Sequence, residues 1–490
     1  MQNPNNTTEL KKEILVRLIK AFYSDDFAKT ADKIPFDMRP KNAEIPYRCC
    51  IYKERAILRQ RVIASLGHNV ESDDEMKPLY NYAQEAMQRE NLEEDILTVI
   101  DTACHGCVPN RIYVTDLCQN CVAKPCINSC HFNAISSING KSVIDGNKCK
   151  GCMKCMQACP YNAIAKIIVP CENSCPTKAI HKNEHGHAEI DFSKCIGCGA
   201  CVATCPFGAV HEKSQVIDVL RKIKEGKKLV AMLAPSVVGQ IPFSINKIAQ
   251  ALIDIGFYKV IEVARGADIT AVNEAKDFKE RMEKGDKFMT TSCCASYKEL
   301  VRNHVPELAP FVSATLTPMA YTAEIAKKEV PDCLSVFIGP CVAKRKEGQF
   351  DKNVDFVMSF EEMDDIFTAL ELDLSKCQDY EFDVAASKEG RNFAITGGVA
   401  NSVKVASDED EVAKISPVLI NGLDVKSIRE LKSWAKNGEC PEGNLVEVMT
   451  CEGGCVGGSS CVSNKRTATK CIQQYAAEGK SLKDTPVKID

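Results

Sequence analysis

The sequence predicts an α/β C-terminal region with parallel β-sheet, residues 213–490, after a cysteine-rich α+β region, 101–212, and a mainly helical N-terminal region, 1–100. Three observations support this division. Helical periodicity occupies much of the first region, and 16 of the 28 cysteines fall between Cys104 and Cys205. Apolar strand-like runs alternate with helical patterns in the last region, which is typical of parallel sheets with crossover helices. A chain of 490 residues is long enough for several domains.

Composition and charge narrow the class of protein. Apolar residues make up 45% and charged residues 26%, both ordinary for a globular protein, and the net charge is −4. We therefore expect no nucleic acid and no membrane surface as a partner. No apolar run reaches the ~18 residues of a membrane span. The polar residues 1–9 lack the apolar core of a signal peptide, so we expect a cytoplasmic protein.

In the N-terminal region, apolar residues recur at helical spacing over residues 10–19 and again over 54–66. Three prolines, beginning with Pro35, are expected to interrupt the stretch between these segments. The adjacent Cys49 and Cys50 have no partner motif. We interpret them as ordinary thiols rather than metal ligands.

The cysteines of the second region are better explained as metal ligands than as disulfides. Disulfide scaffolds are typical of small secreted domains, whereas this chain is long and spaces its cysteines as C-x2-C. Thiolate ligands persist where thiols stay reduced, which agrees with a cytosolic location.

Two cysteine runs predict a pair of interleaved [4Fe–4S] clusters. The run Cys149-x2-Cys152-x2-Cys155-x3-Cys159-Pro160 has the signature of bacterial two-cluster ferredoxins. An earlier run is a variant with a longer middle gap: Cys118-x2-Cys121-x4-Cys126-x3-Cys130. Three cysteines of each run bind one cluster and the fourth binds the other. The predicted sets are Cys118, Cys121, Cys126 and Cys159, and Cys149, Cys152, Cys155 and Cys130. Zinc also accepts four cysteines, but it does not need this interleaving.

A second repeat predicts two further clusters. The full signature recurs in Cys195-x2-Cys198-x2-Cys201-x3-Cys205-Pro206, and Cys171-x3-Cys175-Pro176 upstream is the tail of another. Cys175 is predicted to complete the cluster of Cys195, Cys198 and Cys201. Cys171 and Cys205 then need two more ligands, and we predict Cys104 and Cys107; the alternative leaves this pair free. His105 between them is expected beside the cluster, not bound to it. Such a chain of about four clusters is suited to moving single electrons.

Strand ends in the last region predict one convergent site. Strand-like runs cover residues 228–234, 259–263, 334–338 and 445–449. In parallel sheets, sites gather at the carboxyl ends of the strands. Three of these runs lead directly into proline or cysteine, and a fourth strand near 287–289 leads into a cysteine pair. The residues at these ends are Pro235, Pro340-Cys341, Cys451 and Cys293-Cys294.

Four cysteines at these ends are enough for one cubane: Cys294, Cys341, Cys451 and Cys455. Cys451 and Cys455 have the spacing that places two residues on one face of a helix. Glycines beside them, including Gly453 and Gly454, allow the backbone to approach a bulky group closely. The three segments TSCCASY (291–297), PCVAKRKE (340–347) and EVMTCEGGCVGG (447–458) resemble the signature motifs of the [FeFe]-hydrogenase family. The resemblance extends over roughly residues 100–465.

The resemblance implies two parallel-sheet lobes flanked by helices around an H-cluster. This cofactor is a [4Fe–4S] cubane joined through one cysteine sulfur to a di-iron unit with CO, cyanide and dithiolate ligands. By resemblance, the four cysteines hold the cubane, and Cys455 bridges to the di-iron unit. Lys344 would donate to one cyanide, Pro235 and Ser236 match the family segment around the other cyanide, and Met449 would contact the cofactor.

The resemblance also implies a proton route. Cys293 matches the proton-transfer cysteine, and Glu274, Ser313 and Asp277 match the onward relay. Asp277 stands where the best-studied members have glutamate, and it lies three residues from Glu274 within an expected helix over 267–279. A thiol with an ordinary pKa near ~8.5 can hold and release a proton near neutral pH.

The implied reaction is the reversible conversion of two protons and two electrons to H2. Ferredoxin or a similar one-electron carrier is the expected partner, because no strand-linked G-x-G-x-x-G nucleotide fingerprint is present. Hydrogenase maturation proteins would supply the di-iron unit. Two alternatives stay open: a hydrogen-sensing relative, and a non-catalytic iron–sulfur assembly relative. Departures from the family pattern include Gly339 in place of a methionine, and Ala295 and Tyr297 in place of proline and tryptophan.

Overall fold

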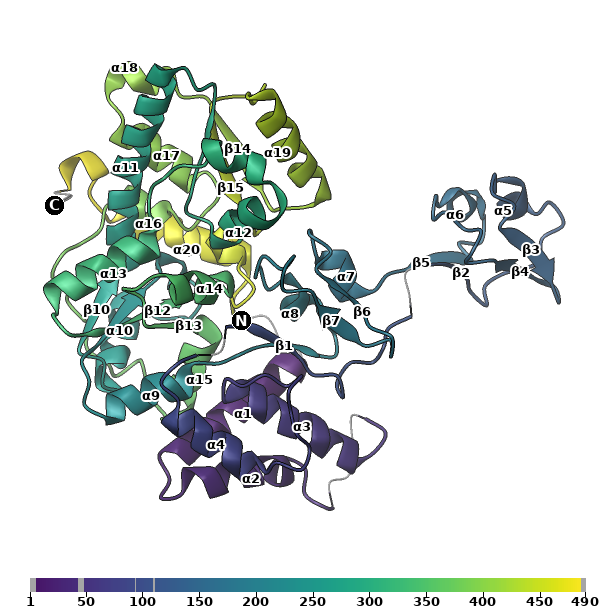
Figure 1. The fold of residues 1–490 in the computed structure, drawn as a ribbon, viewed down its shortest axis with the longest axis horizontal. Helices are drawn as coiled ribbons and strands as arrows, with labels where there is room; N and C mark the ends of the chain where they lie inside the picture. Colours follow the sequence, from purple (N-terminus) through teal and green to yellow (C-terminus); the bar gives the residue numbers. More distant parts are fainter. Residues whose placement is uncertain (1–5, 43–47, 93, 109–110, 486–490) are drawn as a thin grey trace.

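The computed structural model describes residues 6–42, 48–92, 94–108 and 111–485. A small module, residues 111–168, projects from a larger body (Figure 1). The N-terminal helices lie at one end of the body, and the C-terminal half forms most of the remainder. Among the described residues, no helix combines the length and apolar character needed to cross a membrane.

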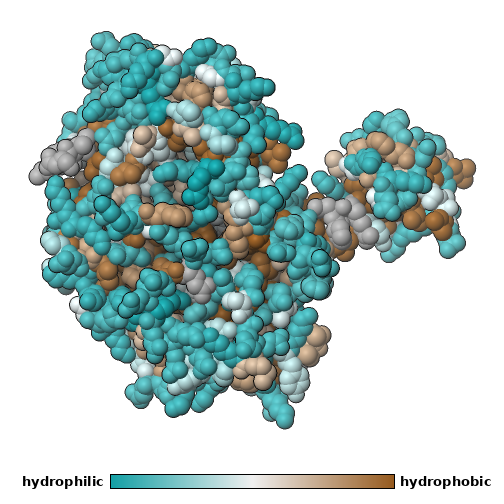
Figure 2. Space-filling model, in the orientation of Figure 1, coloured by the Kyte–Doolittle hydropathy of each residue, from teal (hydrophilic) through white to brown (hydrophobic). Residues whose placement is uncertain are grey.

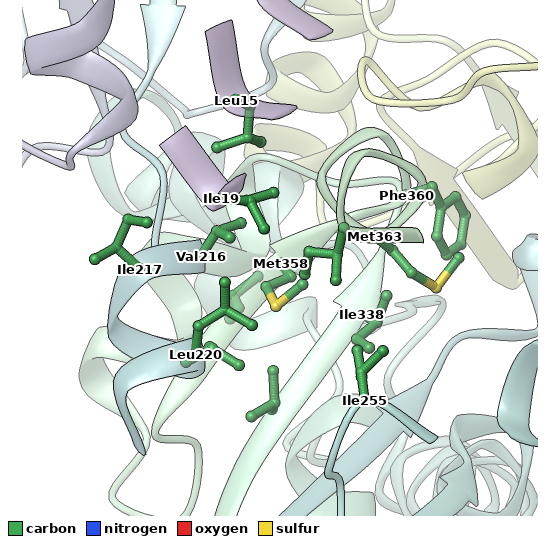
Figure 3. Packing of buried hydrophobic residues seen from close by; sticks show 14 of the residues in the cluster. Leu15, Ile19, Val216, Ile217, Leu220, Ile255, Ile338, Met358, Phe360 and Met363 are labelled. Carbon is green, nitrogen blue, oxygen red and sulfur yellow. The ribbon is translucent and has the colours of Figure 1, made fainter. Parts of the chain in front are cut away.

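The N-terminal helices are joined to the C-terminal half through a shared core. They are α1 (Asn6–Phe22), α2 (Phe27–Met38), α3 (Ile51–Ser65) and α4 (Leu79–Gln88). Leu15 and Ile19 of α1 lie in the same buried cluster as Val216 and Met363 (Figure 3). The interruption predicted at Pro35 is wrong, because α2 continues through this proline to Met38. The proline ring is buried, and its packing offsets the lost helical hydrogen bond.

Two small α+β units carry the cysteine repeats. In the projecting module, β2 (Arg111–Val114) pairs with β5 (Ile164–Ile167), and β3 (Ile135–Ile138) pairs with β4 (Lys141–Ile144), both antiparallel. In the second unit, β6 (Ile180–Lys182) pairs with β7 (Ala188–Ile190), and β1 (Leu97–Val99) with β8 (Val210–Glu212). Four short helices each contain one of the cysteines: α5 (Pro125–Asn128), α6 (Lys154–Ala158), α7 (Pro170–Ser174) and α8 (Ala200–Thr204).

The first of two parallel sheets has the order β10-β9-β12-β13. Its strands are β9 (Leu229–Leu233), β10 (Lys259–Glu262), β12 (Leu334–Gly339) and β13 (Phe356–Ser359). All five residues of β9 are buried, as expected for a central strand covered on both faces. The helices of this part are α9 (Val216–Lys224), α10 (Ile245–Asp254), α11 (Val263–Lys284), α13 (Pro318–Glu329), α14 (Ala343–Phe350) and α15 (Phe360–Ala369). Helix α11 is longer at both ends than the helix expected over 267–279.

The second parallel sheet has the order β11-β15-β14. Its strands are β11 (Met289–Thr290), β14 (Pro417–Asn421) and β15 (Leu445–Met449), so the strand expected at 287–289 is shorter and begins later. The other helices are α12 (Ala295–His304), α16 (Lys388–Asn392), α17 (Gly398–Ala406), α18 (Glu409–Val412), α19 (Val425–Asn437) and α20 (Lys465–Ala477). Short 3₁₀ turns cover Pro235–Val237, Pro306–Phe311, Cys455–Gly457 and Leu482–Asp484. The parallel sheets that the sequence predicts are therefore present, as two separate sheets.

Candidate functional site

The carboxyl ends of both parallel sheets open onto one buried cavity of about 100 Å³. Strands β9 and β12 of the first sheet, and β11 and β15 of the second, each lead into a segment that lines it. The predicted site residues that line the cavity are Pro235, Ser236, Cys293, Cys294, Cys341, Lys344, Met449, Cys451 and Cys455. The structure thus brings together residues from four strand ends that are far apart in the sequence.

Four of these cavity-lining residues are the cysteines expected to hold a cubane. Burial and then the neighbouring thiols raise the pKa of Cys341 to about 11 and that of Cys455 to about 12. Buried thiolates are costly unless a cation compensates them, and iron in a cluster supplies that charge. Cys294 Sγ donates a hydrogen bond to Thr450 Oγ1 at 3.2 Å. Within the described residues, no three His, Cys, Asp or Glu side chains converge tightly enough for a single metal ion.

The backbone between Cys451 and Cys455 is a turn and not the helix that their spacing suggests. Gly453 and Gly454 have φ of +93° and +86°, in the region that side chains disfavour, and Cys455 begins a 3₁₀ turn. A Cβ on Gly454 would lie 2.8 Å from the Ala394 carbonyl oxygen. The glycines therefore allow the close backbone approach that the sequence predicts, and a tight turn rather than helical spacing directs both thiols into the cavity.

Two buried polar groups in the cavity wall fit an anionic ligand. Lys344 Nζ lies 2.5 Å from Glu347 Oε2. Burial lowers the pKa of Lys344, but the Glu347 carboxylate and the thiols of Cys341 and Cys455 outweigh it, so the net shift is upward and the ammonium stays charged. Ser236 is 1% exposed, and its hydroxyl has no hydrogen-bond partner among the described residues. A cation and an unsatisfied donor in the lining of one cavity match the needs of anionic ligands such as cyanide.

Cys293 lies at the start of a chain of polar groups. Burial, then the thiol of Cys294 and the carboxylate of Glu274, raise the pKa of Cys293 well above its ordinary value. The ordinary thiol pKa assumed from sequence is therefore too low for this environment. Glu274 Oε1 accepts hydrogen bonds from the Ser292 backbone N–H at 3.0 Å and from Ser292 Oγ at 3.1 Å. Burial raises the pKa of Glu274 to about 7.

The outer part of this chain leads toward solvent. The Ser313 hydroxyl lies near enough to lower the pKa of both Glu274 and Asp277, and it donates to Thr315 Oγ1 at 2.9 Å. Burial raises the pKa of Asp277, but Arg281, the Ala314 N–H and Ser313 outweigh it, and the net shift is downward. Asp277 Oδ1 accepts from Arg281 Nε at 2.9 Å. The three predicted relay residues therefore form one group that extends from the cavity to the partly exposed face of α11.

The second cysteine repeat lies beside this cavity. The thiols of Cys175, Cys195 and Cys198 raise the pKa of Cys201 after burial, which shows that the four predicted ligands of this cluster are neighbours. Burial raises the pKa of Cys198 most, followed by the thiols of its own predicted cluster and then by the thiol of Cys341 in the cavity lining. This set is thus positioned next to the predicted cubane.

The structure also brings together the four predicted ligands of the cluster that Cys104 and Cys107 are expected to complete. Cys104, Cys107, Cys171 and Cys205 line one small pocket of about 20 Å³. Cys104 Sγ accepts from the Ala188 backbone N–H at 3.4 Å. His105 stacks on Phe207 with ring centroids 4.8 Å apart, as a neighbour of this pocket.

The first repeat occupies the projecting module. Its cysteines, other than Cys121 and Cys152, take part in one small apolar cluster with Ile112 and Ile135. Cys130 and Cys159, which the repeat assigns to opposite clusters, each accept a backbone N–H four residues later at 3.4 Å. The same hydrogen bond occurs at Cys175 and Cys205 of the second unit. In both units, the cysteine that is assigned to the opposite cluster therefore accepts a hydrogen bond from the backbone four residues later.

Sequence reasoning missed several residues in and beside the cavity. Ser292 precedes Cys293 and Thr450 precedes the predicted ligand Cys451, and only the structure shows that Ser292 bonds Glu274 and that Thr450 bonds Cys294. Phe337 also lines the cavity, and a Cβ on Gly339 would lie 2.4 Å from its ring. The aromatic ring therefore takes the space beside Gly339. The apolar run of β12, which is buried continuously from Ser335 to Gly339, was the available signal for Phe337, but it did not give the direction of the ring.

Three protein families match parts of the chain. The iron only hydrogenase large subunit, C-terminal domain, matches residues 227–459. A 4Fe-4S binding domain matches residues 142–165, and an LdpA Fe-S cluster-binding domain matches 165–216. The chain therefore has 4Fe–4S binding units beside a hydrogenase-type C-terminal domain.

Curated relatives agree with these families. The periplasmic [Fe] hydrogenase large subunit of Nitratidesulfovibrio vulgaris is 30% identical over 64% of this chain and 85% of its own length. Iron hydrogenase 1 of Clostridium pasteurianum is 27% identical over 50% of this chain and 52% of its own length. Among solved structures, a variant of the [FeFe]-hydrogenase HydA1 of Chlamydomonas reinhardtii has a TM-score of 0.45 at 20% identity, covering 56% of this chain and 92% of that one.

The chain belongs to the iron-only, or [FeFe], hydrogenase family. It spans about half the length of the Clostridium enzyme.

Proposed function

We propose that this chain is a hydrogenase that interconverts two protons, two electrons and H2 at an H-cluster. The observation that carries the proposal is that Cys293, Lys344 and the four cubane cysteines, from three strand ends, line one buried cavity. Two sheet lobes would enclose the cofactor between them. We place the protein in the cytoplasm, with ferredoxin or a similar carrier as its electron partner and hydrogenase maturation proteins as the source of the di-iron unit.

The cavity residues divide into ligands and anchors. Cys294, Cys341, Cys451 and Cys455 would hold the cubane, with Cys455 shared with the di-iron unit. Lys344 and Ser236 would donate hydrogen bonds to anionic ligands, and Pro235 and Met449 would exclude water by apolar contact. When bound, the H-cluster would supply the redox-active metal at which protons and electrons combine.

Proton delivery is the work of the chain's own side chains. The Cys293 thiol lines the cavity and keeps its proton at neutral pH, so in this proposal it holds the proton that is delivered to the cofactor. Glu274, with a pKa of about 7, can be either protonated or ionised at neutral pH. Protons would reach Cys293 from solvent through Asp277, Ser313 and Glu274, and would leave by the reverse order.

Electrons would follow the cysteine sets from the surface inward. The projecting module holds the outermost pair of proposed clusters, and the set of Cys175, Cys195, Cys198 and Cys201 lies next to the cavity. The set of Cys104, Cys107, Cys171 and Cys205 shares its small unit and would make a fourth. All single-electron steps would therefore end beside Cys341.

Two other functions stay as alternatives. A hydrogen sensor would use the same cofactor for detection, and an iron–sulfur assembly protein would lack the di-iron unit. The position of Cys293 beside Glu274 favours the enzyme over the sensor, because a proton route is needed for turnover. The ammonium of Lys344 in the cavity wall favours a protein that binds the di-iron unit.

Infrared spectroscopy of the chain produced with maturation proteins tests the proposal. Bands of metal-bound CO and cyanide should be present, together with H2 production from reduced methyl viologen. Lys344→Asn should keep the [4Fe–4S] clusters but reduce the CO and cyanide bands at least about tenfold, because a neutral amide cannot replace the cation.

Lys346→Asn is the matched control, since Lys346 lies on the same helix and pairs with Glu299 at 2.9 Å outside the cavity. Matured protein without such bands would contradict the proposal and favour the assembly relative. Bands without turnover would favour the sensor.

A further inference from the structure

A second large pocket, of about 520 Å³, lies away from the catalytic cavity. Helix α3 provides one wall, and the loops that carry His105 and Phe207 provide another, beside the proposed cluster of Cys104, Cys107, Cys171 and Cys205. Its apolar surface comes from Leu10, Ile57 and Leu58. None of the three family matches includes the N-terminal helices that form most of this pocket.

Cationic side chains dominate the pocket wall. Arg39, Arg48, Lys53 and Arg61 line it, against one carboxylate, Glu54. That carboxylate is already engaged, because it accepts from Arg39 Nε at 2.5 Å and from the Arg48 backbone N–H at 2.9 Å. Within the part of the chain that the structure describes, Arg48, Lys53 and Arg61 form no ion pair. Among the described residues, the pocket lining therefore has an excess of positive charge, and the Cys205 thiol of the neighbouring proposed cluster is a further group that compensates Arg61.

Arg61 shows that this charge is built into the fold. Its side chain is buried, with 2% exposed, on the inner side of α3. Nη2 donates to the Phe207 carbonyl at 3.0 Å, whereas Nη1 has no hydrogen-bond partner among the described residues. A buried guanidinium with an unused donor is costly unless an anion meets it. Arg48 is held nearby, with its guanidinium 5.4 Å from the centre of the Phe207 ring.

We propose that this pocket binds a phosphate-bearing small molecule of the nucleotide class, with its phosphate against Arg48, Lys53 and Arg61. Guanidinium groups match phosphate oxygens in geometry and charge. The volume lies within the range of small-molecule sites and exceeds what an inorganic anion fills, so the apolar wall would cover an organic portion.

An acidic protein is the other class of partner for a basic surface. The burial of Arg61 favours a small molecule, because an anion must enter the concave pocket to reach its unused donor. A nucleotide bound here would place negative charge beside the proposed cluster, so occupancy would also act on electron transfer through that cluster.

Calorimetric titration of the cluster-loaded chain with ATP, flavin mononucleotide and inorganic phosphate tests the proposal. At least one nucleotide should bind with a Kd below about 1 mM, and Arg48→Gln and Lys53→Gln should each weaken binding about tenfold. Arg61→Gln should weaken it further. Lys33→Gln, which removes an exposed lysine of α2 outside the pocket, should leave the affinity unchanged.

A second measurement does not depend on the charge variants. Cys49 is exposed and lines the pocket, so a bound nucleotide should slow its alkylation while Cys377, far from the pocket, reacts at an unchanged rate. Absence of nucleotide binding, or binding that both single variants leave unchanged, would overturn the proposal. Binding of inorganic phosphate alone would overturn the nucleotide class. Slower reduction by an acidic carrier protein in the variants, without nucleotide binding, would assign the surface to a protein and also overturn it.

Discussion

The projecting module and the catalytic cavity are both built around cysteines, yet their surroundings are opposite. In the module, Val122 is 99% exposed and Cys152 is exposed, and brown apolar residues reach its surface (Figure 2). Residues 112–168 contain six lysines and two aspartates, a net charge of +4 by count on a chain of net charge −4. In the cavity, burial raises the pKa of Cys341 to about 11 and that of Cys455 to about 12, although the Cys455 side chain is exposed to the cavity space.

Under the proposed function, this difference in surroundings meets two separate requirements of the hydrogenase reaction. Electron exchange with a partner needs an exposed, charged surface that attracts the carrier. Chemistry on protons needs a dry site in which a single route controls their entry. The second cysteine unit, between module and cavity, connects the two environments, with Cys198 near Cys341.

The largest expected effect concerns the buried end. Cys293→Ala removes the thiol that faces the cavity but leaves Cys294 free to bind the cubane. Hydrogen production from reduced methyl viologen, normalised to H-cluster content, should fall by about 10²–10⁴-fold, the range of general-acid catalysis. Cys293→Asp should restore part of the rate, because a carboxyl of similar reach can carry the proton.

The infrared bands of the cofactor serve as the control, and they should persist in both variants. A Cys293→Ala rate above half of the wild-type value would show that protons enter elsewhere. The relay through Glu274, Ser313 and Asp277 would then be abandoned as well.

The next effect concerns the exposed end. Cys152→Ser should remove one cluster of the module and lower the rate with an acidic one-electron carrier protein at least about tenfold, because the docking surface loses its first acceptor. Methyl viologen, a small dye, should still reduce the inner clusters, so its rate should change less than about twofold. Wild-type rates with the carrier should also fall as salt rises. If Cys152→Ser lowered the rates with methyl viologen and with the carrier protein equally, the module would not be the specific entry point for electrons from the carrier.

The sequence predicted the parts of both regions that spacing controls. Cysteine spacing identified the interleaved repeats, and strand ends identified the segments that meet at the cavity, because parallel strands direct their carboxyl ends to one edge. Spacing failed at Cys451 and Cys455, where positive φ at Gly453 and Gly454 makes a turn. Local patterns do not encode tertiary packing, so the buried Pro35 within α2 and the Phe337 ring beside Gly339 were found only in the structure.

An effect of intermediate size concerns the cluster predicted for Cys104, Cys107, Cys171 and Cys205. The ligand sets predict five cubanes, or about 20 irons, in chain reconstituted without the di-iron unit. Changing Cys104 and Cys107 together to serine should remove about four of them. Cys49 and Cys50 provide the matched control, since their double change to serine should leave the iron content as it is. Unchanged iron in the first variant would exclude this cluster, in spite of the shared pocket.

The smallest effect is a pH-dependent change in stability at Glu274. Burial raises the pKa of this carboxyl to about 7 from its ordinary value of 4.5. Between these two values the folded chain holds a proton that the unfolded chain releases. The free energy of unfolding should therefore fall as pH rises through this window, by about 3 kcal/mol in all. Below pH 4.5 both states are protonated and the penalty is absent.

Glu274→Gln keeps an oxygen that can accept from Ser292 but cannot ionise. Guanidinium unfolding of the cluster-loaded variant should show the same midpoint as wild type near pH 4.5, and a higher one at pH 8. Glu283→Gln, an exposed change on the same helix, should shift the midpoint equally at every pH. A Glu274→Gln advantage that is constant with pH, or that grows as pH falls, would mean that Glu274 is already ionised when folded. The buried cavity would then lack the neutral carboxyl that distinguishes its proton route from the solvated charges of the module.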